Sequence, residues 1–365
     1  MMTKSRFGRL RVLLLWLGLV FSLGAQAADS GWAQYKQRFL LADGRIVDTG
    51  NNNVSHTEGQ GFAMLLAVYN DDRPAFDNLW QWTRNTLYRQ DIGLFSWRYE
   101  PGKAVPIADK NNATDGDILI AWALLKAGKR WNVPAYLASS AQIQQALLKH
   151  TVIDYAGYRV MLPGANGFRQ NGSVIVNPSY FVFPAWHAFY QESHLPAWKK
   201  LIDDSMTMVS RMRFGKQHLP SDWVTLQANG QMAPASDWAP RFGFDAVRVP
   251  LYLYWDKADS LSLSPFASFW RGFDRRATPA WLDVLSGQRS EYNQSPGMRA
   301  VRDLTVGDRG PLKDRLAPDE DYYSASLHLL AYRAQRSQLV PSPQPSPCTD
   351  RGHGRQVFKD MVNTF

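Results

Sequence analysis

Residues 113–131, ATDGDILIAWALLKAGKRW, predict a core helix that begins with two carboxylates. From Ile118 to Leu125 the apolar side chains recur three and four positions apart, which is the spacing of one helix face. Asp115 and Asp117 come directly before this pattern. Either acid can cap the helix or favour its dipole, but two carboxylates after an asparagine-rich loop are more than a cap requires. We therefore expect a buried helix whose first turn also carries functional acids.

The rest of the chain repeats this alternation of helix and loop. The predicted helices are Gly61–Tyr69, Arg73–Tyr88, Asp117–Trp131, Ser140–His150, Phe183–Ser193, Ala197–Arg213, Asp245–Trp255, Ser264–Phe273, Pro279–Leu285, Pro296–Arg302 and Tyr322–Arg333. Only two short segments, Tyr158–Leu162 and Val174–Val176, alternate like strands. This pattern predicts an all-α fold, and paired helices of these lengths suit a closed ring of hairpins.

Long loops and tryptophans mark the candidate functional surface. Four connecting segments are long and rich in Asn, Gly or Trp, namely 44–57, 93–113, 164–180 and 219–243. Long ordered loops in a compact helical protein are usually functional. Aromatic residues make up 13% of the chain, with 14 Trp, and Trp97, Trp223 and Trp238 fall in these loops. Ordinary packing explains any one of them, whereas several together suggest stacking surfaces for sugar rings.

The two ends of the chain differ from its body. Four cations precede an apolar run from Val12 to Leu23, which ends in the small-x-small pattern Ala-Gln-Ala at 25–27. This run is too short to span a bilayer and has the form of a secretory signal peptide. We predict that residues 1–27 are a signal peptide cleaved after Ala27, which directs the protein to the periplasm or the medium. Residues 336–365 are rich in Pro and Ser and predict a disordered tail, which leaves 28–335 as the folded domain.

Charge and cysteine content limit the classes of binding partner and the interactions that can stabilise the fold. The formal net charge is +9, and removal of the four leader cations leaves +5. Because no run of Lys and Arg is evident in the body, a nucleic-acid partner is not expected. Cys348 is the one cysteine and lies in the predicted tail. The fold must therefore be stabilised by its core, which a domain of this length can supply.

Two further acids stand in segments that a solvated helix face explains poorly. Glu58 lies in HTEGQG, residues 56–61, where a loop enters a helix; it is either an N-terminal cap or a functional acid. Asp245 lies in RFGFDAVRVP, residues 241–250, between apolar neighbours. Arg248 follows three residues later, so the two side chains can pair on one face of a helix.

Other catalytic chemistries find little support in the sequence. His56 and Glu58 are possible metal ligands, but there is no HExxH motif and the other histidines lie far apart. There is no G-x-S-x-G motif for a serine nucleophile, and Cys348 is in the tail. We therefore predict neither a metal nor a cofactor.

The three acidic segments resemble glycoside hydrolase family 8, and within it most closely the periplasmic endoglucanases encoded with bacterial cellulose synthase. Residues 113–131 resemble the family signature, with its Ala-Ser/Thr-Asp-Ala/Gly-Asp opening and closing aromatic residue. Residues 57–61, TEGQG, resemble the proton-donor segment, and residues 244–248, FDAVR, resemble the segment that carries the base. The likeness extends from about residue 30 to 334.

This resemblance implies an (α/α)6 barrel, six helical hairpins in a ring, with long loops and a few short strands forming the substrate cleft. It also implies hydrolysis with inversion, in which Glu58 is the acid and Asp245 the base. Their environments should shift the pKa values of the two carboxyl groups in opposite directions. Glu58 should stay protonated, and Asp245 should stay ionised with help from Arg248. Asp115 would bind the sugar at the cleavage subsite and help distort its ring.

The remaining implied roles concern aromatic residues. Trp97 and Tyr180 lie in segments similar to the family's cleft, where they would bind sugar rings. Tyr322 and Tyr323 resemble a late tyrosine pair near the catalytic water, and the sequence leaves open which of the two faces inward.

Taken together, the residues and the resemblance predict an endo-1,4-β-glucanase that hydrolyses internal bonds of cellulose. The family also contains chitosanases, xylanases and mixed-linkage glucanases (lichenases), so the substrate is an open alternative. A non-catalytic polysaccharide-binding barrel is a second alternative, although a binder has no need of the paired carboxylates. The prediction includes a monomer without a membrane span in the mature chain and an association with the cellulose synthase machinery.

Overall fold

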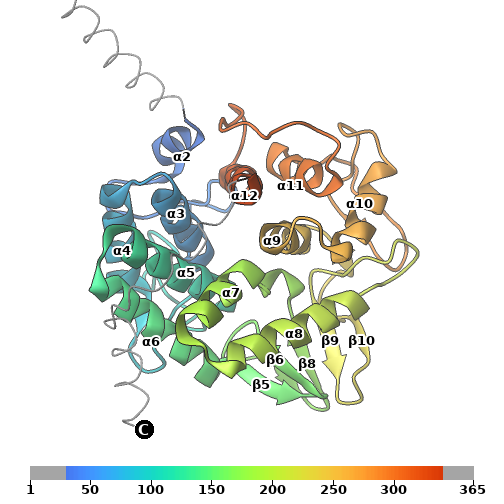
Figure 1. Ribbon diagram of the computed structural model, residues 1–365, viewed down its shortest axis with the longest axis horizontal. Helices are drawn as coiled ribbons and strands as arrows, with labels where there is room; N and C mark the ends of the chain where they lie inside the picture. The colour runs from blue at the N-terminus through green and yellow to red at the C-terminus, as the bar shows by residue number, and fades with distance from the viewer. Residues whose placement is uncertain (1–29, 340–365) are drawn as a thin grey trace, which may run out of the picture.

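The computed structural model describes residues 30–339, which form two concentric layers of helices (Figure 1). The inner helices are α3 (Thr57–Tyr69), α5 (Thr114–Trp131), α7 (Phe183–Ser193), α9 (Arg248–Asp256), α11 (Pro296–Val306) and α12 (Tyr322–Leu339). Each contacts the next in this order, and α12 contacts α3, so the ring is closed. The predicted all-α architecture, the (α/α)6 barrel, is confirmed.

The outer layer contains five helices, each packed on an inner one. They are α2 (Gly31–Phe39) on α12, α4 (Arg73–Leu87) on α3, α6 (Pro134–His150) on α5, α8 (Pro196–Arg211) on α7, and α10 (Ser264–Arg271) on α11. Their burial is one-sided: α4 buries Phe76, Leu79, Trp80, Thr83 and Leu87. Between α11 and α12, residues 307–321 contain no helix. The outer layer therefore has a loop where a sixth helix would complete it.

Close packing of α3 against α5 places two of the predicted site residues side by side. Both helices are apolar nearly all round, as expected for helices surrounded by protein. A Cβ atom on Gly61 would lie 2.6 Å from Leu119 Cβ, and one on Gly116 would lie 2.3 Å from Thr57 Oγ1. Only glycine permits this approach. The first turns of the two helices, with Glu58 and Asp115, consequently meet at one end of the barrel.

Short strands connect the long loops at the rim of the barrel. The largest sheet has the order β10 (Met232–Pro234), β9 (Val224–Gln227), β8 (Ser173–Val176) and β7 (Arg169–Gln170), all antiparallel. The hairpin β5 (Val152–Tyr155) and β6 (Tyr158–Met161) lies beside it, and β2 (Tyr88–Arg89) pairs with β3 (Leu94–Phe95). Pairing of β1 (Ser55–His56) with β4 (Arg98–Tyr99) joins the loop before α3 to the loop that carries Trp97.

Most predicted elements are present, and the differences have local causes. Ten of the eleven predicted helices exist, nine of them with shifted ends and one, Phe183–Ser193, with the predicted ends, and both predicted strands are present as β6 and β8. The predicted helix Asp245–Trp255 begins only at Arg248, so Asp245 lies in the preceding turn. Helix α2 was not predicted. Its buried residues, Gly31, Trp32, Tyr35 and Phe39, cover little more than two turns.

The prediction of a helix over Pro279–Leu285 was wrong. This segment contains β12 (Leu282–Asp283), which pairs with β11 (Arg241–Phe242). From Ala280 its burial alternates, with Ala280, Leu282 and Val284 buried and the two residues between them partly exposed. An alternation with period two is the pattern of a strand with one buried face.

The predicted domain end at 335 was also too early. Helix α12 continues to Leu339, and its last turn packs on α9. The Trp255 indole N–H donates to Ser337 Oγ at 3.2 Å, and Gln338 donates to the Trp255 carbonyl at 2.7 Å. The signal peptide and the rest of the predicted tail lie outside the described residues. Within residues 30–339, none of the helices combines the length and apolar character that a bilayer crossing requires.

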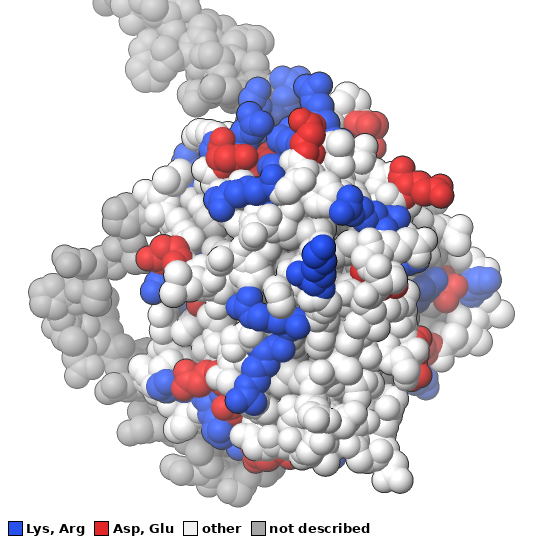
Figure 2. Space-filling model, turned by 90° about the vertical axis from the view of Figure 1, so that its right-hand side faces the viewer, with Lys and Arg blue, Asp and Glu red and all other residues white. Residues whose placement is uncertain are grey.

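Lys and Arg residues gather on one side of the barrel, which the sequence did not predict. Figure 2 shows them as a band down the middle of the face near α10, with acids mainly toward its edges. A cavity of about 880 Å³, which we call the wall groove, adjoins the loop that replaces the sixth outer helix. The cations lining it are Arg275, Arg276, Arg299, Arg309, Lys313 and Arg315. They come from separate segments, so no cluster is visible along the sequence.

Candidate active site

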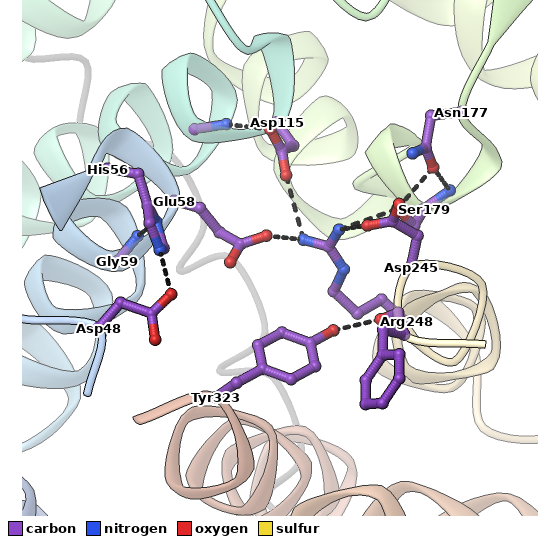
Figure 3. A network of polar contacts seen from close by, with 12 residues as sticks. Asp48, His56, Glu58, Gly59, Asp115, Asn177, Ser179, Asp245, Arg248 and Tyr323 are labelled. Atoms are coloured by element: carbon purple, nitrogen blue, oxygen red, sulfur yellow. Dashed lines mark hydrogen bonds and ion pairs between the residues drawn. The ribbon is translucent and has the colours of Figure 1, made fainter. Parts of the chain in front are cut away.

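One buried arginine lies at the centre of the acidic residues. Arg248 is the first residue of α9, and only 2% of it is exposed. Its Nη1 donates to a carboxylate oxygen of Glu58 and to Asp115 Oδ2, the latter at 3.1 Å. Its Nη2 donates to Asp245 Oδ1 at 2.7 Å and to Ser179 Oγ at 3.1 Å. The structure thus brings all three predicted acids to one guanidinium (Figure 3).

The first turn of α3 leaves Glu58 free for a role other than capping. His56 is the N-cap, and its Nδ1 accepts the Gly59 N–H at 3.2 Å. Its Nε2 lies 3.2 Å from Asp48 Oδ2, which fixes the ring. Because the cap is provided by another residue, the Glu58 carboxylate extends toward Arg248, as Figure 3 shows.

The two acids of α5 have different surroundings. Asp117 accepts the Phe95 N–H at 3.1 Å and the Asn112 amide at 2.8 Å, so it joins two loops to the helix. Asp115 points instead to Arg248. Burial raises the pKa of Asp115 to about 7; Arg248 opposes this shift, and the charges of Glu58 and Asp245 add to it. Asp115 is therefore a buried acid that can exchange a proton near neutral pH.

Arg248 and burial act in opposite directions on Asp245. Burial raises the pKa of Asp245, and the guanidinium of Arg248 opposes this shift without overcoming it. Arg248 contacts Glu58 as well, so one cation serves both carboxylates. Arg248 thus favours the ionised form of Asp245, and the ionised state of this carboxyl stays a prediction.

Four predicted residues line one cavity at this end of the barrel. The cavity measures about 180 Å³, and Glu58, Asp115, Trp97 and Tyr180 are among its lining residues. Trp97 is held by a hydrogen bond from its indole N–H to Asp109 Oδ2, 2.8 Å long. The Tyr180 ring centroid lies 5.9 Å from the Arg248 guanidinium carbon. Larger cavities exist elsewhere, but this one brings two of the predicted acids together with Trp97 and Tyr180.

The neighbouring tyrosines of α12 have different positions. Tyr323 donates its hydroxyl to the carbonyl of Phe244, the residue before Asp245, and its ring faces the acids in Figure 3. Tyr322 is 1% exposed and packs at 5.3 Å, centroid to centroid, against His56. The structure thus places Tyr323 beside the turn that carries Asp245, and Tyr322 against His56, two residues before Glu58.

Two residues near the base were not singled out from the sequence. Ser179, in the turn Pro178–Tyr180, accepts from Arg248 and donates to Asn177 Oδ1 at 2.7 Å. Asp222, in the loop before β9, accepts the N–H groups of Gly243 at 3.0 Å and Ala246 at 2.7 Å. No sequence signal identifies Asp222, because the residues it contacts follow more than twenty positions later.

Residues 30–339 contain no group of three His, Cys, Asp or Glu side chains arranged to hold a metal ion. Although three carboxylates converge at the site, the position between them is taken by the Arg248 guanidinium. The arrangement is suited to proton transfer between carboxyl groups and a bound substrate.

Comparison with known proteins gives the same family over nearly the whole chain. Residues 6–337 match the sequence model of the family described as "Glycosyl hydrolases family 8". The chain is 54% identical over 288 residues to an endoglucanase of Cellulomonas uda, covering 79% of this chain and 80% of the relative.

Two solved structures are similar in both sequence and fold. Endoglucanase Cel10 of Klebsiella pneumoniae, a family 8 glycosyl hydrolase, has a TM-score of 0.83 and 52% identity, covering 84% of this chain and 99% of that one. An endo-β-1,4-glucanase from an Achatina fulica gut metagenomic library has a TM-score of 0.83 and 54% identity, covering 85% and 98%.

Proposed function

This chain belongs to glycosyl hydrolase family 8 and is an endo-1,4-β-glucanase, and we propose that it cleaves cellulose with inversion, using Glu58 as the acid and Asp245 as the base. The single observation that carries this proposal is the convergence of Glu58, Asp115 and Asp245 on Arg248 at one end of the barrel. A purely binding barrel would have no use for three partly buried carboxylates that raise the cost of folding.

We infer a single displacement by water, with one carboxyl group as acid and the other as base. An inverting hydrolase needs its two carboxyl groups roughly 6.5–9.5 Å apart, so that a water fits between the base and the sugar. Glu58 and Asp245 contact different nitrogens of one guanidinium, which keeps them on opposite sides of it. Asp245 accepts a proton from the attacking water while Glu58 gives its proton to the leaving glycosidic oxygen. The water oxygen then bonds to the anomeric carbon as the bond to the leaving oxygen breaks.

Arg248 and Asp115 support this step in different ways. The Arg248 guanidinium and the three carboxylates face the same end of the barrel. When a sugar enters there, its hydroxyl groups therefore compete with Arg248 for hydrogen bonds to the carboxylates. Asp115 lines the cavity and can accept a hydrogen bond from a sugar hydroxyl at the cleavage subsite. Trp97 and Tyr180 line the same cavity and supply aromatic surfaces against which sugar rings can stack.

The assignment of the acid and the base is tested by two isosteric substitutions. Glu58→Gln and Asp245→Asn should each lower kcat on carboxymethylcellulose by more than 100-fold and leave the binding of cellopentaose within about threefold, because neither amide can transfer the required proton. Proton NMR of a fresh digest should show the α-anomer first. Retention of a tenth of the activity in either variant, or a β-anomeric product, would contradict the proposal.

The preference for cellulose within the family is a proposal that rests on the relatives named as endo-β-1,4-glucanases. A reducing-sugar assay on cellulose, lichenan, xylan and chitosan tests it directly. We expect the highest kcat/KM on the soluble β-1,4-glucan and less than a tenth of that value on chitosan. Higher activity on xylan or chitosan would assign the site to another branch of the family.

We also propose that the protein acts outside the cytoplasm, as a monomer associated with the cellulose synthase machinery. The support is the signal-peptide pattern at residues 1–27 and an activity directed at an extracytoplasmic polymer. Cell fractionation should place the chain, with Ala28 at its N-terminus, in the periplasm or medium. Light scattering tests whether the protein is a monomer, and co-purification with the synthase tests the association.

A further inference from the structure

We propose that Asp222 is a positioning residue for catalysis, which holds the turn that carries the general base Asp245. This inference rests on the proposed role of Asp245 and adds a residue outside the acidic segments considered so far. Asp222 does not contact Arg248, Glu58 or Asp115 through any hydrogen bond found in the described residues. Its hydrogen bonds to the site go to the backbone of the turn that carries Asp245.

The contacts of Asp222 bracket the base on both sides. Its Oδ1 accepts the N–H of Gly243, two residues before Asp245, and the N–H of Ala246, the residue after it. One oxygen atom thereby fixes the chain at both ends of the Phe244–Asp245 pair. The Asp222 backbone is itself anchored, because its N–H donates to the Arg241 carbonyl at 2.6 Å.

The same carboxylate stabilises the turn that leads into α9. The residue at the N-cap position, Val247, makes no side-chain capping bond. Within the preceding turn, Val247 N–H donates to Gly243 O and Arg248 N–H donates to Asp245 O, both at 3.0 Å. A carboxylate that accepts the free N–H groups of such a turn stabilises it and also favours its dipole. Asp222 therefore orients Asp245 and the start of the helix that carries Arg248.

Gly243 leaves room for the second carboxylate oxygen of Asp222. A Cβ atom on Gly243 would lie 2.9 Å from Asp222 Oδ2 and 3.4 Å from Trp281 Cβ. Glycine at this position lets the carboxylate approach the turn closely. Burial raises the pKa of Asp222 to about 7, and the charge of Asp245 adds to this effect. A partly buried acid beside the proposed base would be an unfavourable choice if a simple loop contact were all that was needed.

Two substitutions distinguish the role of Asp222 as a hydrogen-bond acceptor from the role of its negative charge. Asp222→Asn keeps an oxygen that accepts both N–H groups, whereas Asp222→Ala removes it. We expect Asp222→Ala to lower kcat on cellopentaose by 10- to 100-fold with KM within threefold, since a shift of about 1 Å in a catalytic group can cost about 100-fold. Asp222→Asn should restore kcat to within about threefold of the unsubstituted enzyme.

Asp283→Ala is the matched control. Asp283 Oδ1 also accepts two backbone N–H groups, those of Leu285 at 3.0 Å and Ser286 at 2.8 Å, in a turn that carries no predicted site residue. If Asp222→Ala does not fold, Gly243→Ala disturbs the same contact from the other side and should show the same selective loss of kcat. The proposal is overturned if folded Asp222→Ala keeps its kcat, or if Asp222→Asn is as impaired as Asp222→Ala.

The Asp245→Asn variant, measured in parallel, keeps the two proposals apart. If it retains activity, the role of Asp245 as base is wrong. If it is inactive while Asp222→Ala is fully active, the role of the base stands and only the positioning role of Asp222 is lost.

Discussion

Positive charge is used in opposite ways in two regions of this barrel. At the end of the inner ring, one buried cation, Arg248, contacts three carboxylates. In the wall groove, six Lys and Arg side chains share a cavity with three acids. Of these acids, Asp303 is paired with Arg275 and with Arg302, and Glu320 accepts from Ala317 and Ser324.

The difference reflects burial. Arg248 is withdrawn from water, so its charge must be balanced by nearby carboxylates, and their charges by it. Four of the six wall-groove cations are exposed and two are partly buried, so water screens much of the repulsion between them. Even so, burial lowers the pKa of Arg299, and the neighbouring Arg275 guanidinium adds to the effect. The centre is therefore a tightly coupled charge cluster, whereas the wall groove is a loosely coupled one, and the two should respond differently to substitution.

The largest effect is expected when the central cation is removed. Arg248→Leu leaves three partly buried carboxylates without their shared partner, and breaking a buried ion pair in this way typically costs about 3–5 kcal/mol. We expect a lower free energy of unfolding by that amount in urea and a loss of kcat exceeding 100-fold. Arg248→Lys should recover part of the stability, since it keeps the charge but cannot contact all three acids at once. A stable and active Arg248→Leu enzyme would show that the cluster is not coupled.

A second prediction concerns the dependence of stability on pH. The pKa of Asp115 in the folded state is about 7, above its value in the unfolded chain. Between about pH 4 and pH 7 the folded state thus binds more protons, so the free energy of unfolding falls as pH rises through this range. Asp115→Asn removes this contribution. Its stability relative to the unsubstituted enzyme should increase by roughly 2–4 kcal/mol from pH 5 to pH 8, measured by urea denaturation. Parallel curves for the two proteins would refute the shift.

A smaller loss of kcat is expected at one of the two neighbouring tyrosines of α12, Tyr323, and not at Tyr322. Tyr323→Phe removes the hydrogen bond to the Phe244 carbonyl, which helps to hold the turn of the base. We expect kcat on cellopentaose to fall by about 3- to 10-fold, with little change in melting temperature. Tyr322→Phe is the control, because the Tyr322 hydroxyl has no hydrogen-bond partner among residues 30–339. Equal losses in both variants would argue against a special role for Tyr323.

Some parts of these regions can be predicted from the sequence and others cannot, depending on how far apart in the sequence the contacting residues lie. Helix α5 is predictable because its apolar spacing and its acids lie within 19 consecutive residues. The grouping of Glu58, Asp115 and Asp245 was predicted from the family resemblance, since no local pattern relates positions so far apart. The choice between Tyr322 and Tyr323 depends on the orientation of α12, which local spacing does not determine.

The failures have the same origin. The segment Pro279–Leu285 pairs with Phe242, about forty residues earlier, and this pairing decides between strand and helix. Asp222 appears in the sequence as an ordinary loop acid until Gly243 and Ala246 are seen beside it. The wall-groove cations come from several segments that only the closed ring brings together.

The smallest effect is expected in the wall groove. Arg276 has no side-chain hydrogen bond or ion pair in the described part of the chain, and Arg299 donates only to the Gln294 carbonyl. Replacing Arg276 by Ala removes one of several like charges, so the free energy of unfolding should change by no more than about 0.5 kcal/mol. The kcat on neutral cellopentaose should be unchanged. Because exposed charges are screened by salt, the difference in melting temperature between Arg276→Ala and the unsubstituted enzyme should disappear in 1 M NaCl. A large loss of stability or activity on this substitution would mean that the wall groove is coupled to the centre, and that the contrast between the two regions is wrong.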